Sequence, residues 1–491
     1  MSKLDANTIL PVSWSFVPLK KLGDWSGGGT PSKAKPQYWQ GGTIPWISPK
    51  DMKTERISDS EDHITKEAVS HSATSLINAG SVLIVTRSGI LRHTLPVAVN
   101  SVPVTINQDL KALTPRNGIV AEYVAWALRA FSRDILHTCS KQGTTVNSVE
   151  TSKLLGFEIP VAPSGQQTKI VAEIEKKFFR LDEAVANLKR VKANFKRYKA
   201  AVLKAAVEGK LTEDWRKQHP NIESASKLLE RILTERRAKW KGKGAYKEPA
   251  GPDTTDLSTL PQGWVWTSLG QIFKICIGAT PSRGKPEYWN GNIAWVSSGE
   301  VAFCRIRQTR EHITEEGLDN TSTEIHPPGT VLMGMIGEGK TRGQAAILDI
   351  AACNNQNSAA IRVSEAGVPS EYVYRYLEGQ YAENRSIGSG NNQPALNKSR
   401  VQTIPLPLSP LAEQREIVAE VERHLSVIDE LEATVQANLT RADRLRQSIL
   451  SRAFSGRLLG EDTKHAPDIS TTFSIAAESQ ARYGRANRAR R

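Results

Sequence analysis

One stretch of the sequence, Gly334 to Thr341, matches the phosphate-binding loop pattern Gly-x-x-x-x-Gly-Lys-Thr. Such a loop holds a nucleotide phosphate where a strand precedes it and a helix follows, because the N-terminus of the helix faces the phosphate. Residues 331–333 suit the strand, but residues 345–350 have the pattern of a second strand rather than a helix. We therefore expect a hairpin turn here, and a phosphate-loop nucleotide-binding protein remains an alternative.

The other polar side chains that could do chemistry lie in predicted loops. Arg can pair with guanine, Asn and Gln with adenine, and Ser and Thr with a base or a phosphate. The same residue types also form turns, and for the Asn-Gln pairs contact and turn are equally good interpretations. The candidate DNA-binding residues are Arg87, Ser88, Arg92, Asn107, Gln108, Lys141, Gln142, Thr144, Thr145, Lys340, Arg342, Asn355, Gln356, Ser389, Asn391 and Asn392.

Catalytic and metal-binding patterns are not found in the sequence. His, Cys and carboxylate residues lack metal-ligand spacing, no Ser occupies a nucleophile elbow, and residues 326–329 lack the amide and the aromatic ring of an adenine-methyltransferase tetrapeptide. We expect no catalytic, cofactor-binding or metal site in this chain. The four cysteines show no paired spacing and no run approaches the ~18 apolar residues of a membrane span, so a cytoplasmic protein without a membrane partner is expected.

The charge favours a polyanionic partner. The net charge is +14 and the pI is about 9.5. Residues 176–216 carry 12 Lys or Arg against 5 Asp or Glu, residues 227–247 carry 8 against 2, and the last eleven residues add five arginines. A solvated helix face with a disordered tail is the structural alternative, but phosphate contact explains a cation-rich helix better.

Two long helices are predicted to position these loops. Residues 166–207 carry one apolar stripe at steps of three and four, which is typical of a helix that packs on another helix. Residues 411–454 repeat this pattern, and residues 170–173 and 417–420 are identical. The pair forms either an intramolecular antiparallel coiled coil or two docking rods for other subunits. The stripe of the first helix is Leu181, Val185, Leu188, Val191, Phe195, Tyr198 and Val202.

The segments that precede the two helices are also duplicated. Residues 30–39 match residues 280–289 around a Thr-Pro-Ser and a Tyr-Trp motif, and we interpret the tryptophans, with Trp46 and Trp295, as core anchors. The chain is thus one unit of roughly 250 residues written twice, with inserts that differ between the copies. Further matched pairs are 63–65 with 312–314, 80–83 with 329–332, 107–108 with 355–356, and 122–124 with 371–373.

The predicted fold class is α+β, with two mixed α/β recognition domains and two long helices in a pseudo-twofold arrangement. A basic connector between the copies contains one short amphipathic helix near Leu228 and Ile232. The predicted divisions are 1–163 for the first recognition domain, 164–212 for the first long helix, 213–259 for the connector, 260–410 for the second recognition domain, 411–459 for the second long helix, and 460–491 for a basic, disordered tail.

The order of these motifs resembles the specificity (S) subunit of type I restriction-modification systems. Each copy runs from Thr-Pro-Ser through Tyr-Trp and Ile-x-Trp to a proline-rich junction, Ile159–Pro163 or Ile404–Pro410, and then to a Gln-x-x-Ile-Val helix. The connector, with Asp214-Trp215-Arg216, is similar to the central region of that family. The resemblance covers nearly all of the chain up to Leu459.

The resemblance implies a division of labour. Each globular domain would be a target-recognition domain that reads one half of a bipartite, asymmetric DNA site, and the coiled coil would set the spacer and dock two methyltransferase subunits. S-adenosylmethionine, ATP and Mg²⁺ would bind partner subunits, which include a motor and nuclease subunit. This chain would be a non-catalytic recognition subunit. The alternatives are a coiled-coil scaffold that does not bind DNA and, less favoured, a methyltransferase–nuclease fusion.

Overall fold

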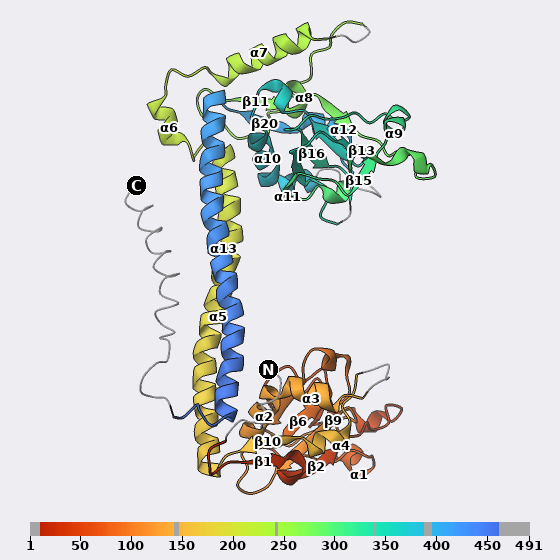
Figure 1. Ribbon diagram of the computed structural model, residues 1–491, viewed down its shortest axis with the longest axis vertical. Helices are drawn as coiled ribbons and strands as arrows, with labels where there is room; N and C mark the ends of the chain where they lie inside the picture. The colour runs from red at the N-terminus through yellow and green to blue at the C-terminus, as the bar shows by residue number, and fades with distance from the viewer. Residues whose placement is uncertain (1–9, 142–146, 241–243, 338, 387–394, 461–491) are drawn as a thin grey trace. The chain divides into compact units, whose positions relative to one another are not determined.

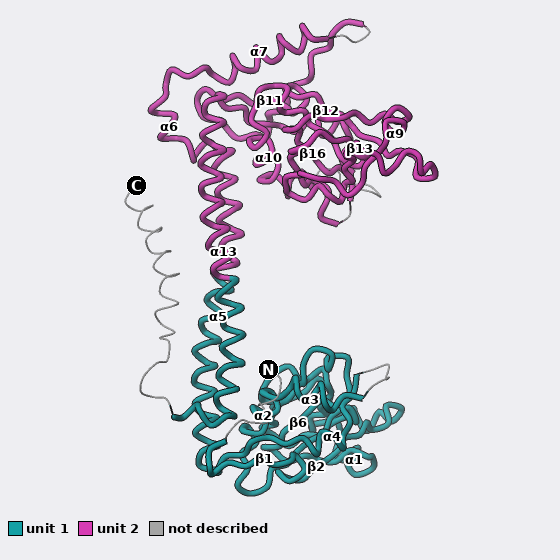
Figure 2. Tube along the Cα trace, in the orientation of Figure 1, with its two compact units in different colours: residues 1–190, 436–491 teal, residues 191–435 magenta. Residues whose placement is uncertain are grey.

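The computed structural model describes residues 10–141, 147–240, 244–337, 339–386 and 395–460. The chain divides into two compact units, residues 1–190 with 436–491 and residues 191–435 (Figure 2). Each unit contains one globular domain and one half of each of two long helices (Figure 1). The two units are therefore described one after the other.

The described residues of the globular domain of unit 1 form three sheets, four short α-helices and three 3-10 helices. Its strands are β1 (Ser15–Pro18), β2 (Gly23–Gly27), β3 (Ile44–Ile47), β4 (Arg56–Ile57), β5 (Asp62–Ile64), β6 (Val82–Val85), β7 (Val97–Asn100), β8 (Thr105–Ile106), β9 (Leu110–Pro115) and β10 (Glu158–Val161). Its α-helices are α1 (Lys66–Ser70), α2 (Ala121–Ala130), α3 (Ser132–Cys139) and α4 (Thr151–Gly156), and its 3-10 helices are η1 (Leu19–Lys21), η2 (Pro36–Tyr38) and η3 (Gly89–Arg92).

A five-stranded sheet in the order β2-β9-β6-β7-β4 forms the centre of unit 1. All four residues of β6 are buried, as the apolar run 82–85 predicts for a strand covered on both faces. Helix α2 packs on β6 and β7, and Tyr123 in α2 donates a hydrogen bond of 2.9 Å to the carbonyl of Pro160 in β10. This helix therefore links the sheet to the junction before the first long helix.

Unit 2 contains the second globular domain and the connector. Its strands are β11 (Val265–Ser268), β12 (Ile275–Ile277), β13 (Trp289–Val296), β14 (Cys304–Ile306), β15 (Glu311–Ile313), β16 (Val331–Gly334), β17 (Ala345–Leu348), β18 (Cys353–Asn354), β19 (Ser358–Ile361) and β20 (Pro405–Leu408). Its short α-helices are α6 (Glu213–Gln218), α7 (Ala225–Ala238), α8 (Leu269–Ile272), α9 (Glu315–Asp319), α10 (Ser370–Gly379), α11 (Tyr381–Ser386) and α12 (Lys398–Thr403); its 3-10 helices are η4 (Pro286–Tyr288), η5 (Ser298–Glu300) and η6 (Ser364–Ala366).

The sheets of unit 2 repeat those of unit 1 strand for strand. The order β12-β19-β16-β17-β14 corresponds to β2-β9-β6-β7-β4, and β15-β13-β18 corresponds to β5-β3-β8. Both five-stranded sheets are mixed, because the β4–β7 and β14–β17 pairs are parallel while their other pairs are antiparallel. The predicted duplication and the predicted α+β class are confirmed at the level of topology.

The two long helices are α5 (Ser164–Val207) and α13 (Leu411–Phe454), each of 44 residues. In unit 1 the end of α13 belongs to the hydrophobic core with Ile170 of α5, and Arg446 bonds to Asp182. In unit 2 the Lys199 ammonium lies 2.8 Å from Asp429 and 3.0 Å from Glu432. Residues later in α5 therefore contact residues earlier in α13, which shows that the two helices pack antiparallel in each unit.

Two further expectations concern single segments. The Gly334–Thr341 stretch connects β16 to β17, which pair antiparallel, so it is the predicted hairpin turn and no helix follows it directly. The connector carries the predicted short helix as α7, in which Leu228 and Ile232 are buried.

Among the described residues, no helix is both long and apolar enough to cross a bilayer. Residues 461–491 of the predicted tail lie outside the described ranges.

Candidate nucleic-acid interface

The Thr-Pro-Ser loop of each copy is held by two tryptophans, which are Trp39 and Trp46 in copy 1 and Trp289 and Trp295 in copy 2. The indole N–H of Trp46 donates to Gly29 O at 3.0 Å, and that of Trp39 donates to Ser32 O at 3.2 Å. Trp295 and Trp289 donate to Ala279 O at 3.0 Å and Ser282 O at 3.1 Å. In each copy the two rings also pack edge to face, with centroids 5.2 Å apart. Trp46 and Trp295 are buried core anchors as predicted, whereas Trp39 and Trp289 are half-buried against the same clusters. All four tryptophans fix the path of this loop.

A glycine brings the same loop against the turn that follows β8 or β18. A Cβ on Gly28 would lie 2.1 Å from the carbonyl oxygen of Asn107, and a Cβ on Gly278 would lie 1.7 Å from that of Asn354. No other residue fits at this separation, because real Cβ contacts are much longer. The backbone N–H of Gly29 donates to Ile106 O at 3.0 Å and that of Ala279 to Asn354 O at 3.0 Å. The loop and the turn therefore form one joined edge in each copy.

The threonine of the loop meets the glutamine of the turn at this edge. Thr30 Oγ1 donates to Gln108 Oε1 at 2.5 Å, and Thr280 Oγ1 donates to Gln356 Oε1 at 2.5 Å. Both glutamines are exposed. We call these two contacts the threonine–glutamine pairs. Sequence analysis did not select Thr30 or Thr280, although both belong to the duplicated motif, because the contact joins residues 78 and 76 positions apart.

The asparagines next to these glutamines have a different role. Asn107 is buried, and its Oδ1 accepts from the backbone N–H of Asp109 at 3.0 Å. Asn355 is buried as well, and its Oδ1 accepts from the N–H of Asn357 at 3.1 Å. Each side chain closes an Asx turn. The sequence leaves two equally good interpretations of the Asn-Gln pairs, a turn or a DNA contact. The structure shows that the asparagine of each pair forms a turn, and that the glutamine is the exposed residue.

Copy 1 adds a charged pair beside its threonine–glutamine pair. Arg87 Nε donates to Asp109 Oδ1 at 2.5 Å, and the arginine side chain is 56% exposed. Ser88 caps η3 through its hydroxyl, which accepts from the N–H of Ile90, and Arg92 is exposed at the end of that helix. The structure therefore gathers Arg87, Gln108 and Asp109 on one edge. Lys141 is exposed and lies near this edge. Its backbone N–H donates to Ser148 O at 2.9 Å, and Ser148 forms a β-bridge with Arg87.

Copy 2 has no charged pair at the corresponding positions, the first of which lies in its β16–β17 connection. The backbone N–H of Met335 donates to Asn357 O at 2.9 Å, as Thr86 N–H donates to Asp109 O at 2.7 Å. This match aligns Ile336 with Arg87 and Asn357 with Asp109. Copy 2 therefore has neither the cation nor the carboxylate of this pair. Lys340 is exposed at the tip of the turn, and its carbonyl accepts from the Tyr381 hydroxyl at 2.7 Å. Arg342 is buried at the base of the turn, where it is only 7% exposed.

Six predicted contact residues lie outside the described ranges. They are Gln142, Thr144, Thr145, Ser389, Asn391 and Asn392. The roles of all candidate residues toward DNA remain predictions, since the positions alone assign no contact.

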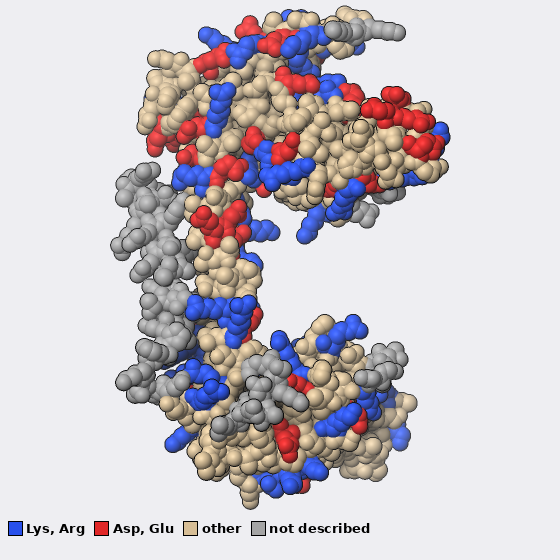
Figure 3. Space-filling view, viewed as in Figure 1, with Lys and Arg blue, Asp and Glu red and all other residues tan. Residues whose placement is uncertain are grey.

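Each Thr-Pro-Ser loop also carries cations, and Figure 3 shows Lys and Arg side chains on the surface of both units. Lys35 Nζ lies 3.2 Å from Tyr38 Oη and Lys285 Nζ 2.8 Å from Tyr288 Oη. In copy 2 Arg283 also stacks 3.8 Å from the Trp289 ring centre and pairs with Glu311. The hydrogen bonds from Arg283 hold the pKa of the Glu311 carboxyl below its usual range. Within the described ranges, no cluster of His, Cys, Asp and Glu could hold a metal ion. The donors on this edge suit an anionic or acceptor-rich partner.

Comparisons with known proteins give the family. The profile of the type I restriction modification DNA specificity domain matches residues 11–192 and again residues 261–441. The EcoR124I/EcoR124II specificity subunit of Escherichia coli is 46% identical over 174 residues, which are 35% of this chain and 42% of that subunit. The StySPI specificity subunit of Salmonella potsdam is 24% identical over 494 residues, covering 95% of this chain and 94% of that subunit.

Solved structures support the same fold. A chain from a structural study of complex assembly and conformational transition in a type I R-M system aligns with a TM-score of 0.64 at 20% identity, over 92% of this chain and 100% of that chain. The HsdS subunit of Thermoanaerobacter tengcongensis aligns with a TM-score of 0.54 at 19% identity, over 91% and 98%. Because the specificity profile matches both halves and most of the sequence, this chain belongs to the family of type I restriction-modification DNA specificity subunits.

Proposed function

We propose that each globular domain reads one half of a split, asymmetric double-stranded DNA site. The observation that carries this proposal is the pairing of one scaffold with two different loop sets. The strand orders are the same in both copies, yet the ion pair of Arg87 with Asp109 in the first has the uncharged Ile336 and Asn357 at the corresponding positions in the second. Domains with the same fold and different exposed side chains suit two base sequences.

The two long helices would set the distance between the half-sites and dock two methyltransferase subunits. A helix of 44 residues is about 66 Å long, which exceeds one turn of duplex at ~34 Å. We infer that S-adenosylmethionine binds the methyltransferase subunits, and that ATP and Mg²⁺ bind a separate motor and nuclease subunit. These partner subunits would carry the chemistry, after the target base leaves the duplex.

The direct test is to map methylated sites in cells that express the whole system. Arg87→Ala should relax or change the bases of one half-site and leave the other half-site and the spacer unchanged. Asp24→Ala, at an exposed carboxylate on β2 of the same domain, is the matched control and should leave the mapped site unaltered. A change in both half-sites after Arg87→Ala would contradict the assignment of one domain to one half-site.

The role of the helices is tested by their length. Inserting one heptad after Val185 and one after Ala442, both within unit 1, keeps the apolar stripes facing each other. The rod should lengthen by about 10 Å and the recognised spacer should grow by about three base pairs, at ~3.4 Å per base pair. An unchanged spacer in an active complex would exclude the helices as the ruler.

A further inference from the structure

The threonine–glutamine pairs are the part of the candidate interface that is the same in both copies. In each pair, Thr30 with Gln108 and Thr280 with Gln356, the threonine hydroxyl donates to the glutamine Oε1 over 2.5 Å. The side chains beside them differ, since Arg87 in copy 1 corresponds to Ile336 in copy 2. Residues that read different base sequences are expected to differ between the copies. A shared exposed contact is better suited to a feature that every half-site has.

The hydrogen bond from threonine also fixes which end of the glutamine amide faces outward. Each Oε1 accepts from the hydroxyl, so each Nε2 is left with N–H donors, and neither has a hydrogen-bond partner in the described part of the chain. A glutamine that reads adenine uses its oxygen and its nitrogen together. The threonine engages one lone pair of each Oε1 and holds the oxygen toward the loop, so the two N–H donors are the groups that each amide presents, and phosphate oxygens are acceptors.

The charge around both glutamines is consistent with an anionic ligand. In copy 1 the neighbouring carboxylate, Asp109, is paired with Arg87, and in copy 2 its counterpart is the neutral Asn357. Neither glutamine therefore has an unpaired negative charge next to it in sequence. The loop that supplies Thr30 carries Lys33 and Lys35. The loop that supplies Thr280 carries Lys285 and Arg283, of which Arg283 is paired with Glu311.

We propose that Gln108 and Gln356 are matched anchors for the DNA phosphate backbone, one in each specificity domain, and that they do not read bases. Thr30 and Thr280 are positioning residues that hold each amide with its N–H groups outward. The buried asparagines fix the turn, and the copy-specific residues at the same edge remain available for base contact. This inference rests on the proposed DNA-reading function and assigns a sequence-independent task within it.

Binding of duplex DNA by the full chain assembled with its methyltransferase subunits tests the proposal. Gln108→Ala and Gln356→Ala should each weaken binding about tenfold, because each removes hydrogen bonds to a charged group. The loss should be equal for the cognate duplex and for a duplex with scrambled half-sites, and the methylated sequence should not change. Gln218→Ala, at an exposed glutamine of α6 outside both specificity domains, is the matched control and should bind like the wild type.

Ethylation of individual phosphates identifies the contacts. The wild-type complex should show one sensitive phosphate position for each anchor, and Gln108→Ala and Gln356→Ala should each remove a different one. Thr30→Val should weaken binding on both duplexes, since it releases the amide, while Thr30→Ser should retain the hydroxyl and bind like the wild type. Gln108→Glu should bind less tightly than Gln108→Ala, because a carboxylate repels phosphate.

The outcomes separate this inference from the function on which it rests. If the wild-type complex bound no duplex at low salt, the proposed function itself would fail. If both alanine variants bound duplex DNA as tightly as the wild type, or if either variant changed the methylated sequence, Gln108 and Gln356 would not be phosphate anchors. The proposed function would still stand in that case.

Discussion

The two junctions between a globular domain and a long helix solve the same packing problem with different chemistry. In unit 2 the Glu413 side chain is fully buried at the start of α13, where Trp264 Nε1 donates to it at 2.8 Å and Thr212 Oγ1 at 2.7 Å. The Arg216 guanidinium completes the site, since it bonds to Glu413 and to Gly209 O at 2.9 Å. This junction is a buried ion pair.

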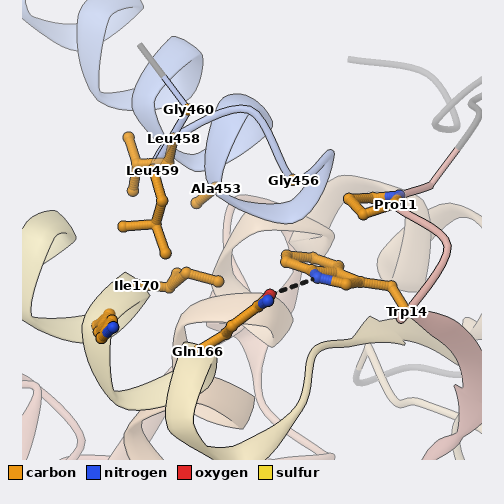
Figure 4. A pocket seen from close by; sticks show the side chains of 10 residues that line it. Pro11, Trp14, Gln166, Ile170, Ala453, Gly456, Leu458, Leu459 and Gly460 are labelled. Carbon is orange, nitrogen blue, oxygen red and sulfur yellow. Dashed lines mark hydrogen bonds between the residues drawn. The ribbon is translucent and has the colours of Figure 1, made fainter. Parts of the chain in front are cut away.

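In unit 1 the corresponding residue of α5 is neutral and exposed. Trp14 Nε1 donates to Gln166 Oε1 at 2.9 Å, and the tryptophan and glutamine line an open cavity of about 500 Å³ together with Lys169, Gly456 and Leu459 (Figure 4). By repeat numbering, the counterpart of Arg216 lies beyond Gly460 and outside the described residues. Both junctions thus share an indole N–H that donates to a side chain in the first turn of the long helix. In the second junction that side chain is a buried carboxylate, which we expect to depend on the Arg216 cation.

Removing that cation should have the largest effect. We expect Arg216→Ala to destabilise the junction of unit 2 by about 3 kcal/mol, because it leaves a buried carboxylate without its partner. The double change Arg216→Ala with Glu413→Gln reproduces the neutral side chain of Gln166 and should recover most of the loss. Hydrogen exchange of residues 411–425 in the full chain measures local opening.

The matched control for this comparison is Lys169→Ala, at the rim of the cavity in unit 1. Its side chain is exposed, so residues 164–174 should exchange as in the wild type, within about 0.5 kcal/mol. If Arg216→Ala had as little effect as Lys169→Ala, the ion pair would not stabilise the second junction.

A buried histidine should make unit 2 the more acid-sensitive unit. His326 is fully buried, and its Nε2 donates to Asn354 Oδ1 at 2.8 Å. Its counterpart in the same β-bridge of unit 1 is Ile77. Burial lowers the pKa of His326 from 6.5 to about 4, with a smaller contribution from Arg362 that is opposed by Asn354 and Glu324. Between these values the unfolded state binds a proton that the folded state does not, so stability falls as the pH drops from 6.5 to 4.

The expected loss is about 2.5 kcal/mol at pH 4.5. Hydrogen exchange of β16 and β18, compared with β6 and β8 at pH 7 and pH 4.5, checks this difference after correction for the intrinsic exchange rates. His326→Gln keeps a hydrogen-bonding side chain but does not titrate, and it should remove most of the difference. Equal acid sensitivity of both sheets would show that the histidine does not set the difference.

A third contrast lies at the next residue of each long helix. Gln167 Oε1 accepts from the backbone N–H of Val120 at 2.9 Å, whereas Gln414 Oε1 is buried without a hydrogen-bond partner in the described structure. The counterpart of Val120 is Pro369, which has no N–H to donate. Val120→Pro should therefore destabilise unit 1 by about 1–2 kcal/mol, measured as faster exchange in α2, because it leaves a second buried oxygen unsatisfied. Val120→Ala keeps the N–H and should cost less; if both variants behaved alike, the hydrogen bond would not be the cause.

The reciprocal change should have the smallest effect. By analogy with Val120 and Gln167, Pro369→Ala should supply an N–H to Gln414 Oε1, a gain of about 1 kcal/mol. The same change also gives the unfolded chain more conformational freedom, a cost of about 0.4–1 kcal/mol. We expect the stability of α10 to change by less than about 0.5 kcal/mol. A loss well above this in exchange measurements would mean that Pro369 has a packing role beyond its missing donor.

The repeats and the long helices could be predicted because both are periodic in the sequence. Matched motifs at a separation of about 250 residues gave the duplicated domain, and steps of three and four gave α5 and α13. The hairpin at Gly334–Thr341 followed from the strand pattern after it. The threonine–glutamine pairs could not be predicted, because hydrogen bonds between residues 78 and 76 positions apart depend on the folded path of two loops. The buried position of Asn107 had a local signal, Asn-x-Asp, which is typical of an Asx turn.

The hydrogen bonds at the base of the β6–β7 and β16–β17 loops bear on how new specificities can arise. Val85 N–H donates to Pro96 O at 3.1 Å and Gly334 N–H donates to Gln344 O at 2.8 Å, so both loops close at the same point. The strands beyond keep their pairing although the loop sequences differ. A loop closed at its base can gain residues cheaply, since doubling its length costs only about 0.6 kcal/mol. Insertions, deletions and substitutions in these two connections can therefore accumulate without a folding penalty that selection would remove. Such tolerance makes the recognised sequence an evolvable property of a stable protein.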